Sequence, residues 1–120
     1  MQTLNLPDLE LTPAVEFNKE KNIFRIEGKS LLDNPTAFFE PIKQWFQNYK
    51  REPNPETVLV IKFEYFNIAT SRELLDIFKI LETLPNAKII WHFLEDDEDM
   101  EESGQELAEL VKVPFDFQPY

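Results

Sequence analysis

The sequence contains no cysteine, which excludes a disulfide framework, cysteine-based catalysis and a cysteine-ligated zinc site. It has only two glycines, Gly28 and Gly104, so neither the GxxxxGK[ST] nor the GxGxxG phosphate-binding loop is present. No apolar stretch approaches the ~20 residues of a membrane-spanning helix, and the first residues lack the basic-then-apolar pattern of a signal peptide. These absences argue against nucleotide binding and membrane insertion, and they predict a soluble cytoplasmic protein.

Positive charge is also scarce, with 12 basic residues against 23 acidic ones and a net charge of −11. Binding to nucleic acid or to an anionic membrane depends on clustered Lys and Arg. A chain with this balance repels both kinds of surface. Its partners are therefore expected to be other proteins, some of them with basic surfaces.

What the sequence does contain is enough apolar material for one folded domain across all 120 residues, because 42% are hydrophobic and 11 are Phe. We predict a single α/β domain: a mixed sheet of four or five strands flanked by three helices, in the order β-β-α-β-α-β-α-β. The expected elements are an extended lead-in at 1–13, a hairpin in 14–30, a helix from about Glu40 to Arg51, a strand at 57–66, a helix from Ser71 to Leu84, a strand at 87–94, an acidic helix in 95–112 and an edge strand in 113–120.

Two patterns refine this prediction. The first helix has one apolar stripe at helical spacing, formed by Phe38, Ile42, Trp45, Phe46 and Tyr49. Its regular part is expected to begin near Glu40, because Pro41 is tolerated only in a first turn. The uninterrupted apolar run at 58–61 is typical of a strand covered on both faces.

Nothing in the sequence points to a catalytic site. The one histidine, His92, lies in a strand pattern on the opposite face from Trp91 and Phe93, which is typical of a structural residue. No pair of carboxylates stands out for acid-base work. We therefore predict no catalytic residue, no cofactor and no enzyme, with hydrolysis by acidic residues and a divalent ion as the alternative.

An acidic run at 95–102 holds seven carboxylates in eight residues. Acidic groups stabilise a helix N-terminus, but seven crowded charges also repel one another. The spacing does not fit an EF-hand loop, so we predict no metal site and favour a docking patch for a basic protein surface, with weak divalent-ion binding as the other possibility. The docking candidates are Glu95, Asp96, Asp97, Glu98 and Asp99.

The junction between the strand at 57–66 and the following helix carries two adjacent hydroxyls, Thr70 and Ser71. With Glu73 they match the capping box [ST]-x-x-[DE], in which Thr70 would be the N-cap and Glu73 would reach back to its amide. A helix N-terminus also stabilises an anion, and phosphorylation would add about −1.5 to −2 charge there. Both interpretations, cap and phosphoacceptor, are compatible with the sequence.

The same residues resemble a known family. The stretches YFNIATSRELLDIFKILE and IIWHFLEDDEDMEESGQELAELVKVPFDF, with TPAVEF, IEGKS and FFEPIKQWFQNY upstream, are similar to the SiaC-type regulatory phosphoproteins of bacteria over nearly the whole chain. The resemblance implies a small α/β domain that acts as a non-enzymatic switch. It further implies a dedicated protein kinase, a PP2C-type phosphatase and a diguanylate cyclase that the unmodified form activates, and hence a role in cyclic-di-GMP signalling and biofilm formation.

The chain departs from the family at one important position. The family pattern after Tyr-(Leu/Phe)-Asn places the acceptor threonine where this chain has Ile68, followed by Ala69. Either the acceptor has moved to Thr70 or Ser71, with Thr70 favoured because it aligns with a hydroxyl of the pattern, or this member is a constitutive adaptor. Asn67 matches the pattern and is expected to orient the turn through its side chain. The switch hypothesis requires hydroxyls that a modifying enzyme can reach.

Overall fold

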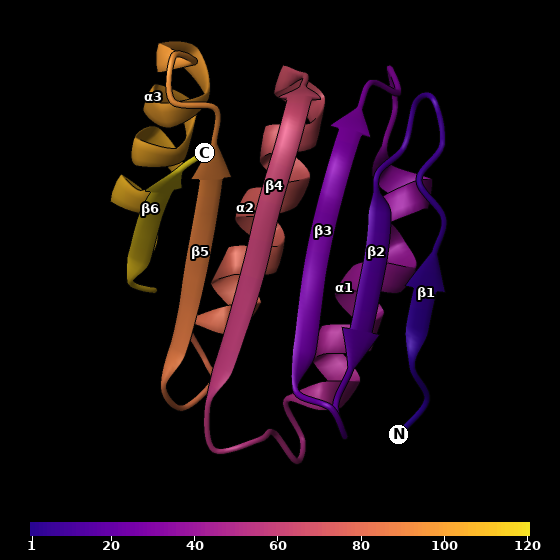
Figure 1. Ribbon diagram of the computed structural model, residues 1–120. Coiled ribbons are helices and arrows are strands. Elements are labelled where there is room, and N and C mark those ends of the chain that lie inside the picture. Colours follow the sequence, from indigo (N-terminus) through magenta and orange to yellow (C-terminus); the bar gives the residue numbers. More distant parts are fainter.

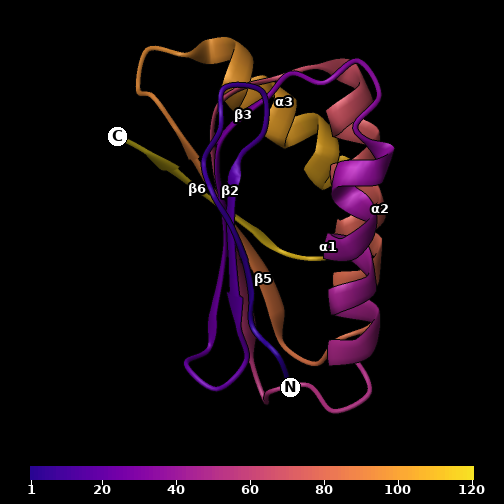
Figure 2. The same ribbon diagram turned by 90° about the vertical axis from the view of Figure 1, so that its right-hand side faces the viewer.

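Six strands form one sheet, and three helices pack on one of its faces, in a computed structural model that describes residues 1–120 (Figures 1 and 2). The α/β class, the mixed sheet and the three helices are confirmed; the sheet has six strands instead of the four or five expected, because one more strand precedes the predicted order. The elements are β1 (Leu4–Leu6), β2 (Ala14–Asn18), β3 (Ile23–Ser30), α1 (Thr36–Tyr49), β4 (Thr57–Phe66), α2 (Ile68–Leu81), β5 (Ala87–Phe93), α3 (Glu98–Glu109) and β6 (Phe115–Pro119).

The sixth strand comes from the N-terminal segment, because residues 4–6 of the expected extended lead-in at 1–13 form β1. β1 pairs antiparallel with β2, and Leu4 and Leu6 lie opposite Phe17 and Val15. The two leucines pack against the core from the edge of the sheet. Burying the two leucines offsets the entropy cost of ordering the N-terminal segment. Three residues are too few for the alternation of a strand to be visible in the sequence.

The strands lie in the sheet in the same order as in the chain. β1, β2 and β3 are antiparallel neighbours, whereas β3, β4, β5 and β6 run parallel. A right-handed crossover that always steps in the same direction places each connecting helix on the same face. Figure 2 shows this arrangement, with the helices on one side of the sheet and the other side open.

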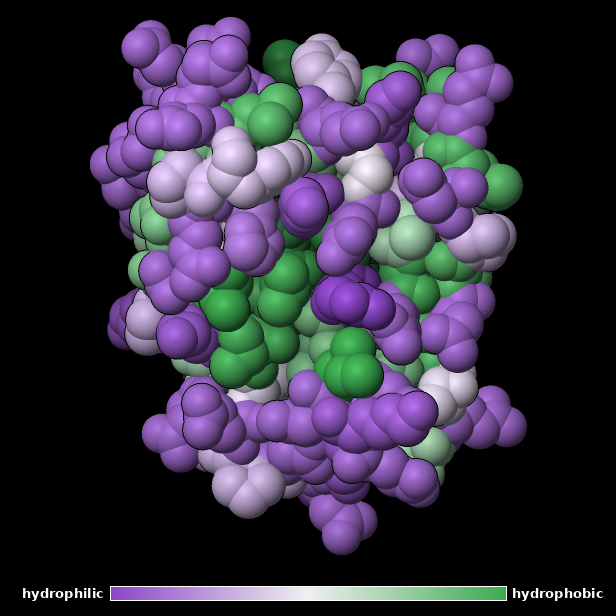
Figure 3. Space-filling view, viewed as in Figure 1, coloured by the Kyte–Doolittle hydropathy of each residue, from purple (hydrophilic) through white to green (hydrophobic).

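The open face corrects the prediction that β4 is covered on both sides. Burial alternates along β4: Leu59 and Ile61 are buried under the helices, whereas Val58 and Val60 are only half-buried. Figure 3 shows the open face, where apolar groups lie between polar ones. Valine is favoured in strands by its β-branch even where one side of the sheet is solvated, so the continuous apolar run did not require a second layer.

Helix α1 begins four residues earlier than expected, at Thr36, and contains Pro41 in its interior. The backbone is already helical before the proline, since the Phe39 amide donates to the Pro35 carbonyl at 3.0 Å. Pro41 is exposed and points away from the core. The earlier start places Phe39 in the buried stripe and leaves Phe38 half-buried beside it.

Candidate functional site

The predicted hydroxyl pair lies where the carboxyl end of β4 meets the first turn of α2, next to the carboxyl end of β3 (Figure 1). Because β3 and β4 are parallel, Ser30 lies opposite Phe66, the last residue of β4. The chain segments around 30 and 70, forty residues apart in sequence, therefore form one site.

Asn67, and not Thr70, is the N-cap of α2. Its backbone is extended, and its Oδ1 accepts a hydrogen bond from the Thr70 amide at 2.9 Å. Its Nδ2 donates to the Leu32 carbonyl at 2.9 Å, and its own amide donates to the Ser30 carbonyl at 3.2 Å. One side chain thus caps the helix and attaches its start to the loop after β3, so the predicted role of Thr70 as cap is wrong.

Thr70 is completely buried, with no exposed surface. Its Oγ1 lies 2.8 Å from Asn67 Oδ1 and 2.7 Å from Ser30 Oγ. A hydroxyl has one proton to donate: with Thr70 donating to Asn67, Ser30 donates to Thr70, and both buried hydroxyls are satisfied. Thr70 therefore belongs to a closed structural cluster beneath the surface.

Ser71 has a different environment. It is half-buried, and its Oγ donates to the Ile68 carbonyl at 2.6 Å, a bond local to the first turn of α2. The side chain lines a groove of about 250 Å³ between the start of α2 and α3. Two exposed apolar residues also line it: Ile68, which is 77% exposed, and Leu110, which is 59% exposed. The groove is completed by Phe66, Asn67, Ser103, Glu106 and Leu107.

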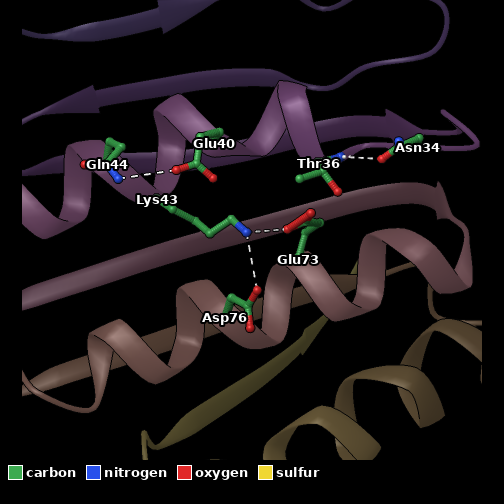
Figure 4. A network of polar contacts seen from close by, with 7 residues as sticks. All are labelled: Asn34, Thr36, Glu40, Lys43, Gln44, Glu73 and Asp76. Atoms are coloured by element: carbon green, nitrogen blue, oxygen red, sulfur yellow. Dashed lines mark hydrogen bonds and ion pairs between the residues drawn. The ribbon is translucent and has the colours of Figure 1, made fainter.

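Glu73 does not reach back to the Thr70 amide, which corrects the predicted capping box. It is buried and forms an ion pair with Lys43 of α1, with a distance of 2.6 Å between Oε2 and Nζ. Lys43 also contacts Asp76 at 3.3 Å, so it joins α1 to α2 (Figure 4). Burial lowers the pKa of Lys43, but the hydrogen bonds and charges of Glu73 and Asp76 outweigh it, and the pKa lies above its usual value.

The acidic docking candidates divide into one capping residue and four free ones. Asp97 is the N-cap of α3, where its Oδ1 accepts from the Met100 amide at 3.0 Å. Glu95, Asp96, Glu98 and Asp99 are exposed, and none of them forms an ion pair within the chain. No group of three or more His, Cys, Asp or Glu side chains is arranged to hold a metal ion.

His92 points to the open face of the sheet, opposite Trp91 and Phe93, as strand alternation predicts. Its ring lies 6.3 Å from that of Tyr120. No helix of the protein combines the length and the apolar character that crossing a membrane requires.

Three participants in the site were not identified from the sequence: Ser30, Lys43 and the α3 wall of the groove. Ser30 ends a strand forty residues before Thr70, and no local pattern connects them. Lys43 lies among other polar residues of an amphipathic helix. Only Leu110 could have been recognised from the sequence, as an apolar residue at the end of an acidic helix; the structure shows that it is exposed.

Comparison with known proteins gives one consistent family. The sequence profile of the SiaC family, described as regulatory phosphoproteins, matches residues 6–120. An uncharacterized protein of Pseudomonas aeruginosa strain UCBPP-PA14 is 22% identical over 124 residues, covering all of this chain and 98% of that protein.

The fold is also similar to solved structures. Apo-SiaC from Pseudomonas aeruginosa superposes with a TM-score of 0.88 at 22% identity, covering 98% of this chain and 99% of the other. The SiaC structure determined in complex with the diguanylate cyclase SiaD, as its activator, gives a TM-score of 0.89 at 21% identity, with the same coverage of both chains.

Proposed function

Because the chain belongs to the SiaC family of regulatory phosphoproteins, we propose that it is a non-enzymatic signalling protein that binds and regulates a partner such as a diguanylate cyclase. The observation that carries this proposal is the family match over nearly the whole length. The similarity in fold to a cyclase activator, without large insertions on either side, agrees with it. The protein would act in the cytoplasm, where such a cyclase has its substrate GTP.

Reversible phosphorylation by a protein kinase and a PP2C-type phosphatase would control the interaction. A phosphate changes the local charge by about −1.5 to −2, which a partner can detect without a change of fold. The relevant surface lies near the start of α2, where the groove contains an accessible hydroxyl and two exposed apolar side chains.

The four free acidic residues before and at the start of α3 would form a docking patch for a basic surface of the partner. Their carboxylates have no partners within the chain, so no internal interaction has to break before they bind. Charges at the rim of an interface raise the association rate more than the final affinity. The patch would therefore steer the partner toward the protein.

A second candidate function is that of a constitutive adaptor. It is favoured by Ile68, which has no hydroxyl and is exposed at the position where the resemblance places the family's acceptor threonine. In that case the protein binds its partner whatever the activity of kinases, and phosphatase treatment of protein isolated from its host leaves binding unchanged.

The experiment that tests the proposal uses the diguanylate cyclases encoded by the protein's own host. Each is purified and assayed for cyclic-di-GMP formation from GTP, with and without the protein, and binding is measured by calorimetry. We expect one cyclase to bind and to change its rate. If none binds and no rate changes, the proposed function is wrong.

A matched variant tests the docking patch in the same assay. Replacing Glu95, Asp96, Glu98 and Asp99 by their amides retains the capping residue Asp97. The association rate should fall and lose most of its salt dependence, whereas the dissociation rate should change little. An unchanged association rate would remove the patch from the interface.

A further inference from the structure

The two hydroxyls at the start of α2 have opposite environments, and this difference determines which of them an enzyme can modify. Thr70 Oγ1 is enclosed by Asn67 Oδ1 and Ser30 Oγ and has no contact with solvent. A kinase could reach it only after the cap of α2 and its link to β3 had opened. A phosphate at Thr70 would then leave a dianion in the core without a basic partner.

Ser71 meets none of these obstacles. The one hydrogen bond of its side chain is to the Ile68 carbonyl three residues earlier, so losing it leaves every contact between β3 and α2 in place. Its side chain lies at the groove, where solvent enters between α2 and α3. From these environments we infer that Ser71, and not Thr70, is the phosphoacceptor of this chain; the inference rests on the proposed function.

The surroundings of Ser71 indicate what the modification changes. Side chains on a helix lean toward its N-terminus, so a phosphate on Ser71 lies near the first-turn amides, where the helix dipole favours an anion. The same phosphate adds negative charge beside Ile68, Leu110 and Glu106. A surface with two exposed apolar side chains thus becomes strongly anionic, while the Ser30–Thr70–Asn67 hydrogen bonds beneath it persist.

The chemistry is a phosphoryl transfer from ATP, supplied by the kinase. Ser71 Oγ attacks the γ-phosphorus, the bond between that phosphorus and the bridging oxygen of ADP breaks, and the hydroxyl proton passes to the kinase's general base. The phosphatase reverses the modification with water: the serine–phosphorus ester bond breaks, Oγ regains a proton and inorganic phosphate leaves. No redox partner is required.

Phosphopeptide mapping of the protein isolated from its own host tests the inference directly. Trypsin cuts after Lys62 and Arg72 and releases a peptide whose serine and threonine residues are Thr70 and Ser71 alone. Fragment ions between these two residues then locate the phosphate. Phosphate on Ser71 is the expected result. Phosphate on Thr70, phosphate outside the peptide, or unmodified peptide at every growth stage would overturn the inference.

Two pairs of variants complete the test. In the host, the Ser71→Ala protein should carry no phosphate. The Thr70→Val protein, which lacks the other hydroxyl at nearly constant shape, should still be phosphorylated. In the purified protein, Ser71→Glu should melt like the wild type and Thr70→Glu far below it. A Ser71→Glu variant that unfolds, or a Thr70→Glu variant that melts like the wild type, would contradict the assigned environments. A phosphate on Ser71 with no cyclase bound would leave this inference intact and contradict the proposed function instead.

Discussion

At the scale of single residues, the start of α2 depends on polar groups that are buried and satisfied. The hydroxyls of Ser30 and Thr70 and the amide of Asn67 form a short chain of hydrogen bonds between β3 and α2. In a buried setting, removing one member leaves its neighbours without partners, and this loss exceeds the net value of the bond itself. The cluster therefore fixes the position of the helix against the sheet.

Replacing Thr70 by Val tests this cluster. The variant retains the shape but leaves Ser30 Oγ and Asn67 Oδ1 each short of one partner, so the free energy of unfolding should fall by about 1–3 kcal/mol. Urea titration followed by circular dichroism measures it. Ser71→Ala is the control, because its hydroxyl bonds only within the first turn, and its effect should stay within about 0.5 kcal/mol. Equal effects for the two variants would contradict the burial of Thr70.

The ion pair between Lys43 and Glu73 predicts a dependence of stability on alkaline pH. The pKa of Lys43 is raised in the folded protein, so the pair contributes fully below about pH 10.4, the usual value for a lysine, and its contribution is lost as the pH rises through the raised value. Lys43→Met should lower the free energy of unfolding at pH 8 by about 2–3 kcal/mol. This is at or below the ~3–5 kcal/mol lost when one partner of a fully buried ion pair is removed, because solvent still reaches Lys43.

Urea titrations of wild type and Lys43→Met at pH 8 and above pH 11 measure the difference between them. Both proteins carry the same three tyrosines, so tyrosine ionisation largely cancels in the comparison. The two stabilities should converge at the higher pH. If the difference in unfolding free energy between the two proteins stays constant across this pH range, the charge of Lys43 does not help to hold α1 against α2.

At the scale of elements, α3 is positioned by a glycine against a tryptophan. A Cβ added to Gly104 would lie 2.5 Å from Trp91 Nε1 and 2.7 Å from Cδ1 and Cε2. The indole itself is fixed by a 3.0 Å hydrogen bond from Nε1 to the Met100 carbonyl. The helix therefore lies directly on the ring, and any side chain at this position would push the two apart.

Gly104→Ala should accordingly destabilise the protein, although alanine is the better helix former. The gain in helix propensity is at most about 1 kcal/mol, whereas overpacking against a buried ring costs about 1–3 kcal/mol. We expect a net loss of about 1 kcal/mol, together with a change in tryptophan fluorescence. Gln105→Ala, at the exposed neighbouring position, is the control and should be neutral or slightly stabilising. A stabilised Gly104→Ala variant would place α3 further from Trp91.

The elements also show which information was local in the sequence and which was not. Periodicity was enough to locate the three helices, the hairpin and β4, β5 and β6, but not the helix ends: α1 begins at Thr36 instead of near Glu40, and α2 begins at Ile68 instead of Ser71. The start of α2 could not be predicted from local sequence, because Asn67 and Thr70 both suit an N-cap. Their roles are determined by hydrogen bonds to Ser30 and Leu32, which lie on another segment. The same distant contacts bury Thr70. A single sequence does not show them, so the favoured hydroxyl was the inaccessible one.

At the scale of the whole molecule, the net charge of −11 acts across the entire fold. The molecule measures 38 × 27 × 23 Å, and the Debye length is about 30 Å at 0.01 M ionic strength but only about 3 Å at 1 M. At low salt, therefore, almost every carboxylate repels every other. This repulsion opposes the compact state and is removed by screening.

The melting temperature at pH 7 should thus rise between 10 mM and 500 mM sodium chloride. The variant that carries amides at 95, 96, 98 and 99 has four fewer negative charges, so its melting temperature should rise less with added salt than that of the wild type. Differential scanning calorimetry measures both effects. A wild-type melting temperature that falls with salt would mean that attractive ion pairs dominate instead.

The order of the strands has a consequence for how the protein is made. Each strand lies beside the one synthesised just before it. The pairing partner of each new strand has therefore already left the ribosome when that strand emerges. No strand ever has to be inserted between two that are already joined. The sheet can grow one strand at a time from its first hairpin, and the contact between Ser30 and Thr70 can form before β6 has joined the sheet.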